Sequence, residues 1–510
     1  MNQMKAYWQN TTADTRLWIV ALGSGLIYLA FTAPYQLSRY YAVSPPVDYA
    51  KLTRYSAVGL IAYLVGIAGL FGLYLIGLRT LAKSQNKIAE SSKLRFVFLG
   101  GLTFALILIL SYPQTAIDLF VYAIRTRGWV LYGLSPFVVP PEYFPTSDPW
   151  LGLAGEWADA ASPYGPVWEW LSLAAYTLSG GNYLGHLFAL KIFSVLAYLG
   201  SAWLVYRIML RIRPHWAVTG AAFFAWNPLV LFESVQNAHN DIIMVFFLLV
   251  AVWAYMQWVE QPKTWMGLIF IAAFTLSILV KFVTLIVLPF FLLGMALRQP
   301  NWARRILVVL LFGLTILLLS VLVMAPYWPG LENWAVLRAG RGAGRSVTAL
   351  LVLALISQAG STGQAFNITN GLIYLLFGVI YVWGLWHVAC QGKRCFHRAV
   401  TTLEASRDLP IRAAFYIFFW YALFVATVFH AWYLLWFMPL AAIMICDRRI
   451  ASGAFVFSLM ALLIIPYYET IRVWIPYLNQ NHILGHVIGV PLLLVPVLFS
   501  LWKPLRVLPE

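Results

Sequence analysis

The chain has 510 residues, of which 62% are hydrophobic and only 10% are charged. Soluble domains usually contain about 25% charged residues, so this composition excludes an ordinary soluble protein. The formal net charge is +16, and the placement of the basic residues along the chain accounts for this excess without a nucleic-acid partner.

Apolar runs long enough to cross a bilayer recur from one end of the chain to the other, which predicts an all-α multi-pass membrane protein. The first run lies at 17–34, and no small-residue cleavage site follows it, so we expect an uncleaved span rather than a signal peptide. We predict about 14 spans in all. They lie at 17–34, 56–78, 95–112, 184–208, 216–232, 241–258, 265–280, 282–297, 305–327, 366–388, 413–429, 432–446, 451–466 and 483–502.

The basic residues predict the orientation of these spans. One set of alternate loops and ends holds 23 of the 34 basic residues but 7 of the 18 acidic residues. The positive-inside rule makes that side cytoplasmic, together with both termini. The long loops at 113–183, 328–365 and 467–482 then lie outside. Cys390, Cys395 and Cys446 fall in or beside cytoplasmic loops, so we expect reduced thiols.

A polar cytoplasmic segment at 79–95 separates the first two spans from the rest of the chain. We therefore predict a two-helix appendage over 1–94 and a main transmembrane domain over 95–510. The loop at 113–183 is rich in Trp, Tyr and Pro, which predicts short interfacial helices on the outer membrane face. The apolar run at 166–180 belongs to them, because a span there would reverse the orientation of the basic loops.

Asp118 stands at the membrane end of this loop. A carboxylate in a partly desolvated cleft can act as a general base. The alternative is a structural role, as a helix cap or in an ion pair with Arg125.

Two apolar runs, 265–297 and 413–446, are too long for one span and have basic residues at both ends. Each is predicted to form a hairpin of short helices, with Lys281 or His430 at its tip. The motif that begins at His430, HAWYLLW, also contains Trp432 and Tyr433. Membrane-interface aromatics account for its rings, whereas His430 suggests a substrate contact.

Two further clusters are candidates for binding. Glu233, His239, Asn240 and Asp241 crowd one turn, where they could cap the next helix, orient a sugar or phosphate, or ligate Mg²⁺ or Mn²⁺. Glycines separate the arginines of the second cluster, whose guanidinium groups suit either a phosphate or anionic lipid headgroups. That cluster comprises Arg338, Arg341 and Arg345.

The motifs DLFVYAIRTRGWVLYGLSPFVVPP, SPYGPVWEWLS, NPLVLFESVQNAHND and HAWYLLW, with Lys281 before a proline-bearing apolar run, occur in this order between residues 95 and about 440. In this they resemble the polyprenyl-phosphate-mannose-dependent α-mannosyltransferases of the GT-C superfamily, in particular the bacterial enzymes that elongate lipid-linked glycans. The resemblance implies a GT-C fold, a polyprenyl-phosphate donor, a glycan or glycolipid acceptor and inverting transfer on the extracytoplasmic face of the cell membrane.

The resemblance also implies that Asp118 is the base. A second acid often found beside it is replaced here by Ile117 and Leu119, which argues against a metal-dependent variant, so we expect no cofactor. Lys281, His430 and the three arginines are candidates for the donor phosphate. The candidates for substrate positioning are Tyr122, Arg125, Tyr164, Glu233, His239, Asn240, Asp241, Trp432 and Tyr433. Two alternatives stay open, namely another lipid-linked sugar (arabinose, glucose or galactose) and a transporter or flippase without chemistry.

Overall fold

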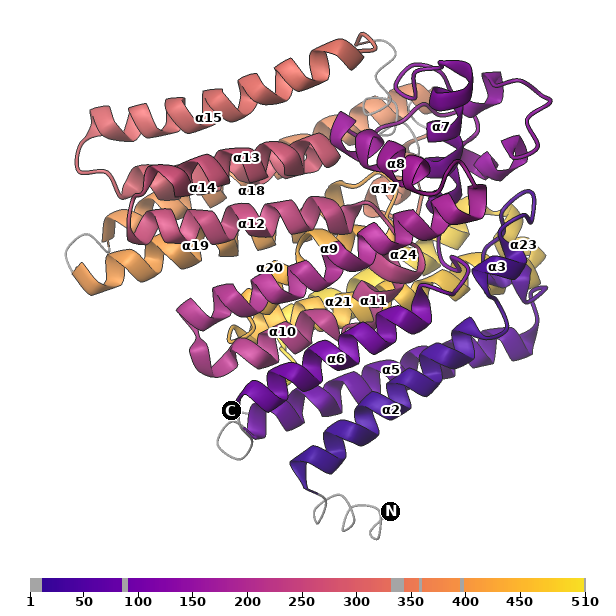
Figure 1. The fold of residues 1–510 in the computed structure, drawn as a ribbon, viewed down its shortest axis with the longest axis horizontal. Coiled ribbons are helices and arrows are strands. Elements are labelled where there is room, and N and C mark those ends of the chain that lie inside the picture. Colours follow the sequence, from indigo (N-terminus) through magenta and orange to yellow (C-terminus); the bar gives the residue numbers. More distant parts are fainter. Residues whose placement is uncertain (1–11, 85–89, 332–343, 357–359, 395–398, 509–510) are drawn as a thin grey trace.

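The computed structural model describes residues 12–84, 90–331, 344–356, 360–394 and 399–508. The described chain is helical and has no β-strand, only two isolated bridges, Gln36 with Ser111 and Gly344 with Val428. Most long helices run side by side along the long axis of the molecule (Figure 1). The predicted all-α multi-pass architecture is therefore observed.

Ten described helical segments are long and apolar enough to cross a membrane. The helices that form them are α2 (Ala13–Thr32), α5 (Ala57–Lys83), α6 (Glu90–Leu108), α9 (Tyr183–Ile212), α12 (Asp241–Glu260), α15 (Trp302–Met324), α18 (Thr362–Arg394), α19 (Ala399–Trp420), α21 (Arg448–Pro466) and α24 (His482–Trp502).

An eleventh candidate is a pair of helical segments, Pro214–Ala225 and Pro228–Gln236, bent by 52°. The pair contains α10 (Ala217–Ala225), α11 (Pro228–Leu231) and a π-helix (Phe232–Gln236). Asn227 and Pro228 account for the bend, because Pro228 has no amide hydrogen and the Asn227 side chain caps the new helix.

The prediction of about 14 spans differs from this count in two places. Residues 264–297 form two shorter apolar segments, made of α13 (Thr264–Val280), a 3₁₀ helix (Phe282–Val287) and α14 (Leu288–Leu297). The span predicted at 432–446 is wrong as a helix of that length. Its residues form a 3₁₀ turn (Ala431–Trp436) and the six-residue α20 (Met438–Ile443).

The first predicted hairpin is confirmed, whereas in the second the returning arm is the 3₁₀ turn and the short α20 rather than a second span. In the first, Lys281 bonds Asp241 at the start of α12, whereas Arg298 donates to the Val259 carbonyl near the end of α12. The chain therefore crosses the length of α12 and returns. In the second, an ion pair joins Arg412 to Asp447 at the two ends of the run, and His430 lies at the turn between them.

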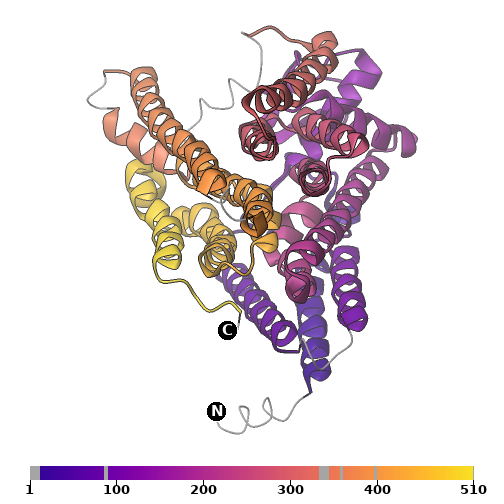
Figure 2. The same ribbon diagram turned by 90° about the vertical axis from the view of Figure 1, so that its left-hand side faces the viewer.

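The most buried helices lie at the centre of the bundle. In the span that contains α21, 83% of the residues in an 18-residue apolar stretch are buried, against 11% in the spans that contain α15 and α18. The exposed Leu and Val side chains of α15 and α18 suit lipid contact. Viewed from the left end of Figure 1, the orange and yellow helices α18, α19, α21 and α24 form one side of the bundle, and helices α9 to α15, coloured from magenta to salmon, form much of the other (Figure 2). The division of the chain at residue 94 stays a prediction.

The remaining short helices gather mainly at the right end of Figure 1. They include α3 (Leu37–Tyr40), α4 (Tyr49–Leu52), α7 (Asp118–Tyr132), 3₁₀ helices at Pro141–Tyr143 and Leu151–Trp157, α8 (Pro166–Leu178), α17 (Val347–Leu355), a π-helix (Tyr467–Ile471), α22 (Arg472–Trp474) and α23 (Pro476–Gln480). Three others adjoin α10, α15 and α19, namely 3₁₀ helices at Pro214–Trp216 and Ala325–Tyr327 and a π-helix at Tyr421–Val425. The 13 residues of α8 extend about 20 Å, too short to cross a hydrocarbon core of about 30 Å, in line with the interfacial helix expected there.

Candidate active site

Asp118 begins α7 and is 6% exposed. Among the described residues, no side chain or backbone group forms a hydrogen bond or ion pair with its carboxylate. Burial is the main cause that raises the pKa of Asp118, and the nearby charges of His239, Lys281 and Arg125 only partly oppose it. A buried acid without a direct partner costs stability, so its presence calls for a functional explanation.

Asp148, in the same loop, provides the contrast. Its carboxylate accepts bonds from Arg127 Nε at 2.8 Å, Tyr132 Oη at 2.6 Å and the Trp150 amide at 2.9 Å. Burial alone would raise the pKa of Asp148, but these bonds outweigh it and lower the pKa. Asp148 is therefore a structural acid, whereas the Asp118 carboxylate has no direct partner among the described residues.

The alternative ion pair between Asp118 and Arg125 is not formed. Arg125 instead donates to the Ala160 carbonyl at 2.9 Å. Behind it, the buried carboxylate of Glu169 accepts a hydrogen bond from Ser162 Oγ at 2.5 Å. Burial raises the pKa of Glu169, and both Ser162 and Arg125 oppose that rise. Arg125 thus ties α7 to the 158–165 segment.

The SPYG segment, residues 162–165, joins this loop to the end of α13. The Gly165 amide donates to the Val280 carbonyl at 3.1 Å. An added Cβ on Gly165 would lie 2.1 Å from the Leu279 carbonyl oxygen, so only glycine allows this approach. As a result Tyr164 stands beside both Lys281, 5.6 Å from the ring centre, and the Tyr122 hydroxyl at 3.4 Å.

Lys281 lies at the centre of the predicted positions. Its ammonium group is 2.8 and 3.0 Å from the two carboxylate oxygens of Asp241. The rings of Tyr433 and Trp436 lie 5.7 and 5.6 Å from the same ammonium group. Trp436 also donates its indole N–H to Asp241. The cation is therefore ion-paired and surrounded by aromatic faces.

The turn before α12 contributes a second array. His239 Nε2 lies 3.2 Å from Glu233 Oε2, and Asn237 Nδ2 donates to the same oxygen at 3.0 Å. The His239 ring stacks on Trp432 at 4.1 Å, and His430 also stacks on Trp432 at 4.1 Å. Burial, helped by the charges of Arg345, His239 and Lys281, lowers the pKa of His430 well below its ordinary value. At neutral pH His430 is therefore an uncharged ring.

Arg345 lies at the edge of this cluster. It pairs with Glu469, and its guanidinium group lies 5.4 Å from the centre of the Tyr468 ring. Gly344, next to it, is bridged to Val428, which brings the segment beside His430. Arg338 and Arg341 lie outside the described residues, so the predicted arginine cluster is described only at Arg345.

The structure thus brings together the predicted positions from five separate segments. Three residues were missed by sequence reasoning, namely Glu156, Trp436 and Glu469. Glu156 follows Gly155, whose added Cβ would lie 3.1 Å from Ile117 beside Asp118. Burial and the charge of Asp118 raise the pKa of Glu156. Trp436 belongs to a recognised motif, but no local signal singles out Glu156 or Glu469.

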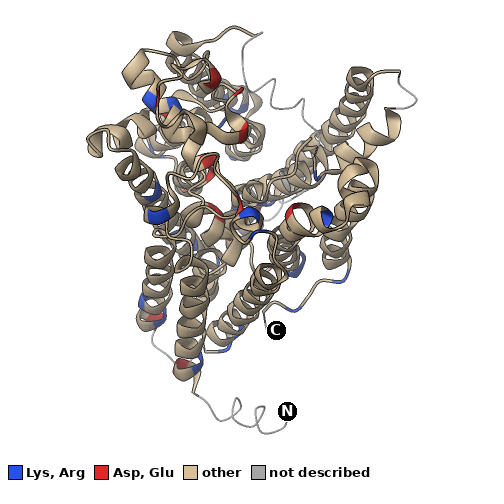
Figure 3. Cartoon of the chain, turned by 90° about the vertical axis from the view of Figure 1, so that its right-hand side faces the viewer, with Lys and Arg blue, Asp and Glu red and all other residues tan. Residues whose placement is uncertain are grey.

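Figure 3 shows the molecule from the end that carries α7, α8 and α23, where the charged positions are few and of mixed sign. In the described ranges, no group of three or more His, Cys, Asp or Glu side chains is placed to hold a metal ion. Glu233 contacts His239, and Asp241 contacts Lys281, so the suggested metal ligands are engaged elsewhere. Metal independence stays a prediction.

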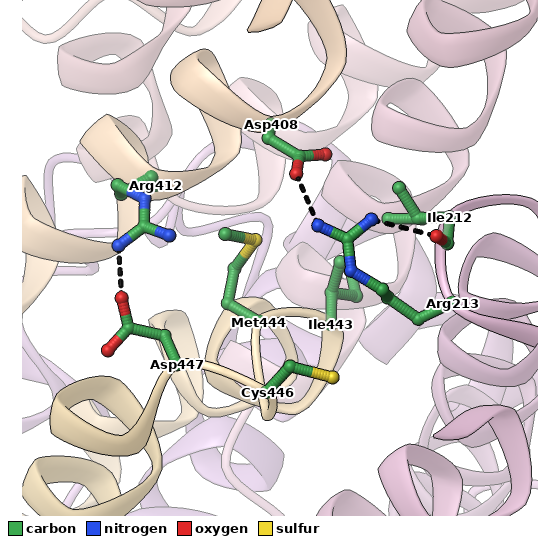
Figure 4. A pocket seen from close by; sticks show the side chains of 8 residues that line it. All are labelled: Ile212, Arg213, Asp408, Arg412, Ile443, Met444, Cys446 and Asp447. Atoms are coloured by element: carbon green, nitrogen blue, oxygen red, sulfur yellow. Dashed lines mark hydrogen bonds and ion pairs between the residues drawn. The ribbon is translucent and has the colours of Figure 1, made fainter. Parts of the chain in front are cut away.

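A cavity of about 260 Å³ lies at the opposite end, near the end of α9 and the start of α21 (Figure 4). Arg213 pairs with Asp408 at 3.2 Å across it, and Arg412 pairs with Asp447. Because these charged side chains pair with each other, we interpret the cavity as a gap between packed helix ends rather than as a second reaction site.

Fold and site together define a helical multi-pass membrane protein with a buried acid, a cation and aromatic rings gathered at one end of its bundle. Residues 17–299 match the family described as alpha-(1->6)-mannopyranosyltransferase, N-terminal domain. The chain therefore belongs to the α-(1→6)-mannopyranosyltransferase family, and the resemblance to mannosyltransferases noted in its motifs is confirmed.

Two individual proteins are similar over part of their length. Alpha-(1->6)-mannopyranosyltransferase B of Corynebacterium glutamicum is 25% identical over 153 residues, which is 28% of this chain and 24% of that protein. The crystal structure of the Archaeoglobus fulgidus oligosaccharyltransferase with zinc and sulfate aligns with a TM-score of 0.39 and 13% identity, over 73% of this chain and 49% of the other. We draw no conclusion from that structural overlap.

Proposed function

We propose that this protein is an inverting mannosyltransferase with a GT-C fold, which moves mannose from a polyprenyl-phosphate donor to a hydroxyl group of a glycan or glycolipid. The reaction takes place on the extracytoplasmic side. Family membership supports mannose as the sugar. The observation that carries the mechanism is the buried carboxylate of Asp118, which lies free of direct partners beside Lys281 and a group of aromatic rings.

In this mechanism the acceptor oxygen attacks the anomeric carbon of mannose from the face opposite the phosphate. Asp118 takes the proton of the acceptor hydroxyl as the new C–O bond forms. The bond between the anomeric carbon and the phosphate oxygen breaks, and the polyprenyl phosphate leaves with its negative charge increased.

The leaving phosphate needs cations placed before the reaction starts. Lys281 and Arg345 supply them, and each is held by a carboxylate, Asp241 or Glu469. His430, uncharged at neutral pH, serves as a hydrogen-bonding or stacking group rather than as a cation. The donor phosphate therefore competes with Asp241 and Glu469 for these cations.

Purified protein, incubated with polyprenyl-phosphate mannose and a glycan acceptor, should yield mannosylated product and free polyprenyl phosphate. Asp118→Asn should lower turnover by at least about a hundredfold while donor binding is retained, since general-base catalysis contributes about 10²–10⁴ in rate. The arabinose, glucose and galactose donors should be used poorly, which mass spectrometry of the products measures.

Asp148→Asn is the matched control, because it removes the same charge from a structural acid in the same loop. It should lower the melting temperature and keep the turnover per folded molecule. Near-normal turnover in Asp118→Asn would refute the proposed base. Failure of the wild-type protein to release polyprenyl phosphate would favour the flippase alternative.

A further inference from the structure

Asn240 is a fully buried polar side chain that the mechanism does not use. It precedes α12 and is 0% exposed. Among the described residues, no group is placed to hydrogen-bond its amide oxygen or its amide nitrogen. Neither ring nitrogen of His239, which is also fully buried, has a hydrogen-bond partner among the described residues, although Nε2 lies 3.2 Å from Glu233 Oε2.

Such unsatisfied groups are costly. Each buried donor or acceptor without a partner costs about 1–3 kcal/mol, and native proteins contain few of them. Both residues belong to the candidate active site. His239 stacks on Trp432, and Asp241, the residue after Asn240, bonds Lys281. The residue before them, Ala238, has a φ of 55°, a strained conformation for alanine.

The ring of His239 is held firmly in place. Glu233 contacts its Nε2 atom, and Trp432 packs on its face at 4.1 Å. Trp432 is itself covered on its other side by His430, so the three rings form one stack. A ring held in this stack keeps its Nδ1 atom at one position, in the residue that directly precedes Asn240.

We infer that His239 and Asn240 form a subsite that binds the ring hydroxyls of the donor mannose. The inference rests on the proposed function and names the part of the donor that these residues recognise. An amide offers one acceptor and one donor, and a pair of adjacent sugar hydroxyls can satisfy both. A phosphate fits poorly, because its oxygens only accept and would leave the amide oxygen without a donor. A cation would leave the amide nitrogen unpaired.

The test exploits the unusual energetics of Asn240. Asn240→Leu has a similar shape but removes the two unsatisfied groups, so the melting temperature should stay the same or rise. Transfer from the mannose donor should nevertheless fall about tenfold or more, because a hydrogen bond to the substrate is lost. If Asn240 were only structural, the melting temperature and activity would fall together.

A series of 2-, 3-, 4- and 6-deoxymannosyl donors identifies the hydroxyl. In the wild-type protein, at least one deoxy donor should lose about tenfold in kcat/KM relative to the full donor. In Asn240→Leu that same deoxy donor and the full donor should react equally well. Unchanged discrimination in Asn240→Leu would overturn the inference.

A binding measurement separates this inference from the reaction itself. The rise in melting temperature that each donor produces is recorded in the Asp118→Asn background, with and without Asn240→Leu. Donor binding that depends on one hydroxyl only when Asn240 is present supports the subsite even if the wild-type protein transfers no sugar. If binding and transfer depend on the donor hydroxyls in the same way with and without Asn240→Leu, the subsite is rejected and the proposed function stays intact.

The control for stability is Ser201→Ala in α9. Ser201 is 0% exposed and its hydroxyl also lacks a partner among the described residues, but it belongs to none of the segments that form the site. This variant should keep the melting temperature and the whole pattern of deoxy-donor discrimination.

Discussion

At the scale of single residues, Asp118 and Asp148 show how one loop gives two acids different properties. Tyr132, the Trp150 amide and Arg127 stabilise the charge of Asp148 and lower its pKa. Asp118 has no direct partner among the described residues, its nearby charges only partly oppose the effect of burial, and its pKa is raised. A carboxylate with a raised pKa is a stronger base, which suits proton removal from a hydroxyl group.

The raised pKa of Asp118 predicts a particular dependence on pH. The protonated form is favoured in the folded state, so its contribution to stability is full below the pKa of the unfolded chain, near 3.8. That contribution is lost as the pH rises through the folded pKa. Asp118→Asn should therefore melt at or above the wild-type temperature at neutral pH, and the difference should vanish in acid.

Transfer by the wild-type protein should increase as the pH rises through the same pKa, because the base works in its ionised form. Melting temperature and kcat/KM, both measured against pH, check this expectation. An Asp118→Asn protein that is clearly less stable than wild type at neutral pH would instead point to a stabilising role for the charge.

Arg345 is the described member of the predicted phosphate-binding arginines. Arg345→Ala should raise the donor KM by about 10–100-fold, since hydrogen bonds to charged groups contribute about 1.5–3 kcal/mol. The control is Arg472→Ala, because Arg472 lies over the same Tyr468 ring, at 5.6 Å, but is no candidate for the donor site. Equal donor KM values in the two variants would favour a role for Arg345 in binding lipid headgroups.

At the scale of elements, the SPYG segment positions the site by contact between backbones. Gly165 allows the loop to meet the end of α13, and the next residue after that helix is Lys281. Tyr164, the residue before Gly165, has its ring centre 5.6 Å from the Lys281 ammonium group. Loop and helix therefore fix the position of Lys281 relative to the loop that contains Asp118, the proposed base.

Gly165→Ala should disturb this arrangement, because the added carbon would lie 2.1 Å from the Leu279 carbonyl oxygen. The loop must move away, so we expect a lower melting temperature and a kcat reduced about tenfold or more, as small misplacements of reacting groups are costly. Gly371→Ala in α18 is the control, since a Cβ there meets nothing within 4 Å. Wild-type kcat in Gly165→Ala would show that the contact does not position the site.

At the scale of the whole molecule, charged residues gather at the two ends of the helix bundle. Arg211 and Arg407 both pair with Glu260, and Arg213 pairs with Asp408. Basic residues from loops far apart in sequence thus share one end of the bundle, opposite the candidate active site. From the positive-inside rule we propose that this end faces the cytoplasm.

This orientation is tested by labelling intact cells with a membrane-impermeant maleimide, in a background without the native cysteines. Ser147→Cys lies in an exposed part of the loop beside Asp148 and should be labelled, whereas Gln261→Cys, exposed at the basic end, should be labelled only after the membrane is opened. The reverse pattern would place the active site in the cytoplasm and contradict the proposed function.

The sequence by itself determined the all-helical membrane class, because long apolar runs have few other stable structures in a bilayer. It also indicated the turns at Lys281 and His430 and singled out Asp118 as a candidate, since basic residues at both ends of a run and a lone acid are local signals. It failed at 432–446, where apolar composition suggested a span but the chain forms short turns that carry Trp432 and Trp436 toward the site.

Only the tertiary structure decided the partners of each charge. Lys281 pairs with Asp241, 40 residues away, and Arg345 pairs with Glu469, 124 residues away. The same is true of the Asp118 carboxylate and the Asn240 amide, which have no hydrogen-bond partner in the part of the chain that the structure describes. Hydrogen bonding and desolvation depend on what surrounds a group in space, and neighbours along the chain do not reveal those surroundings.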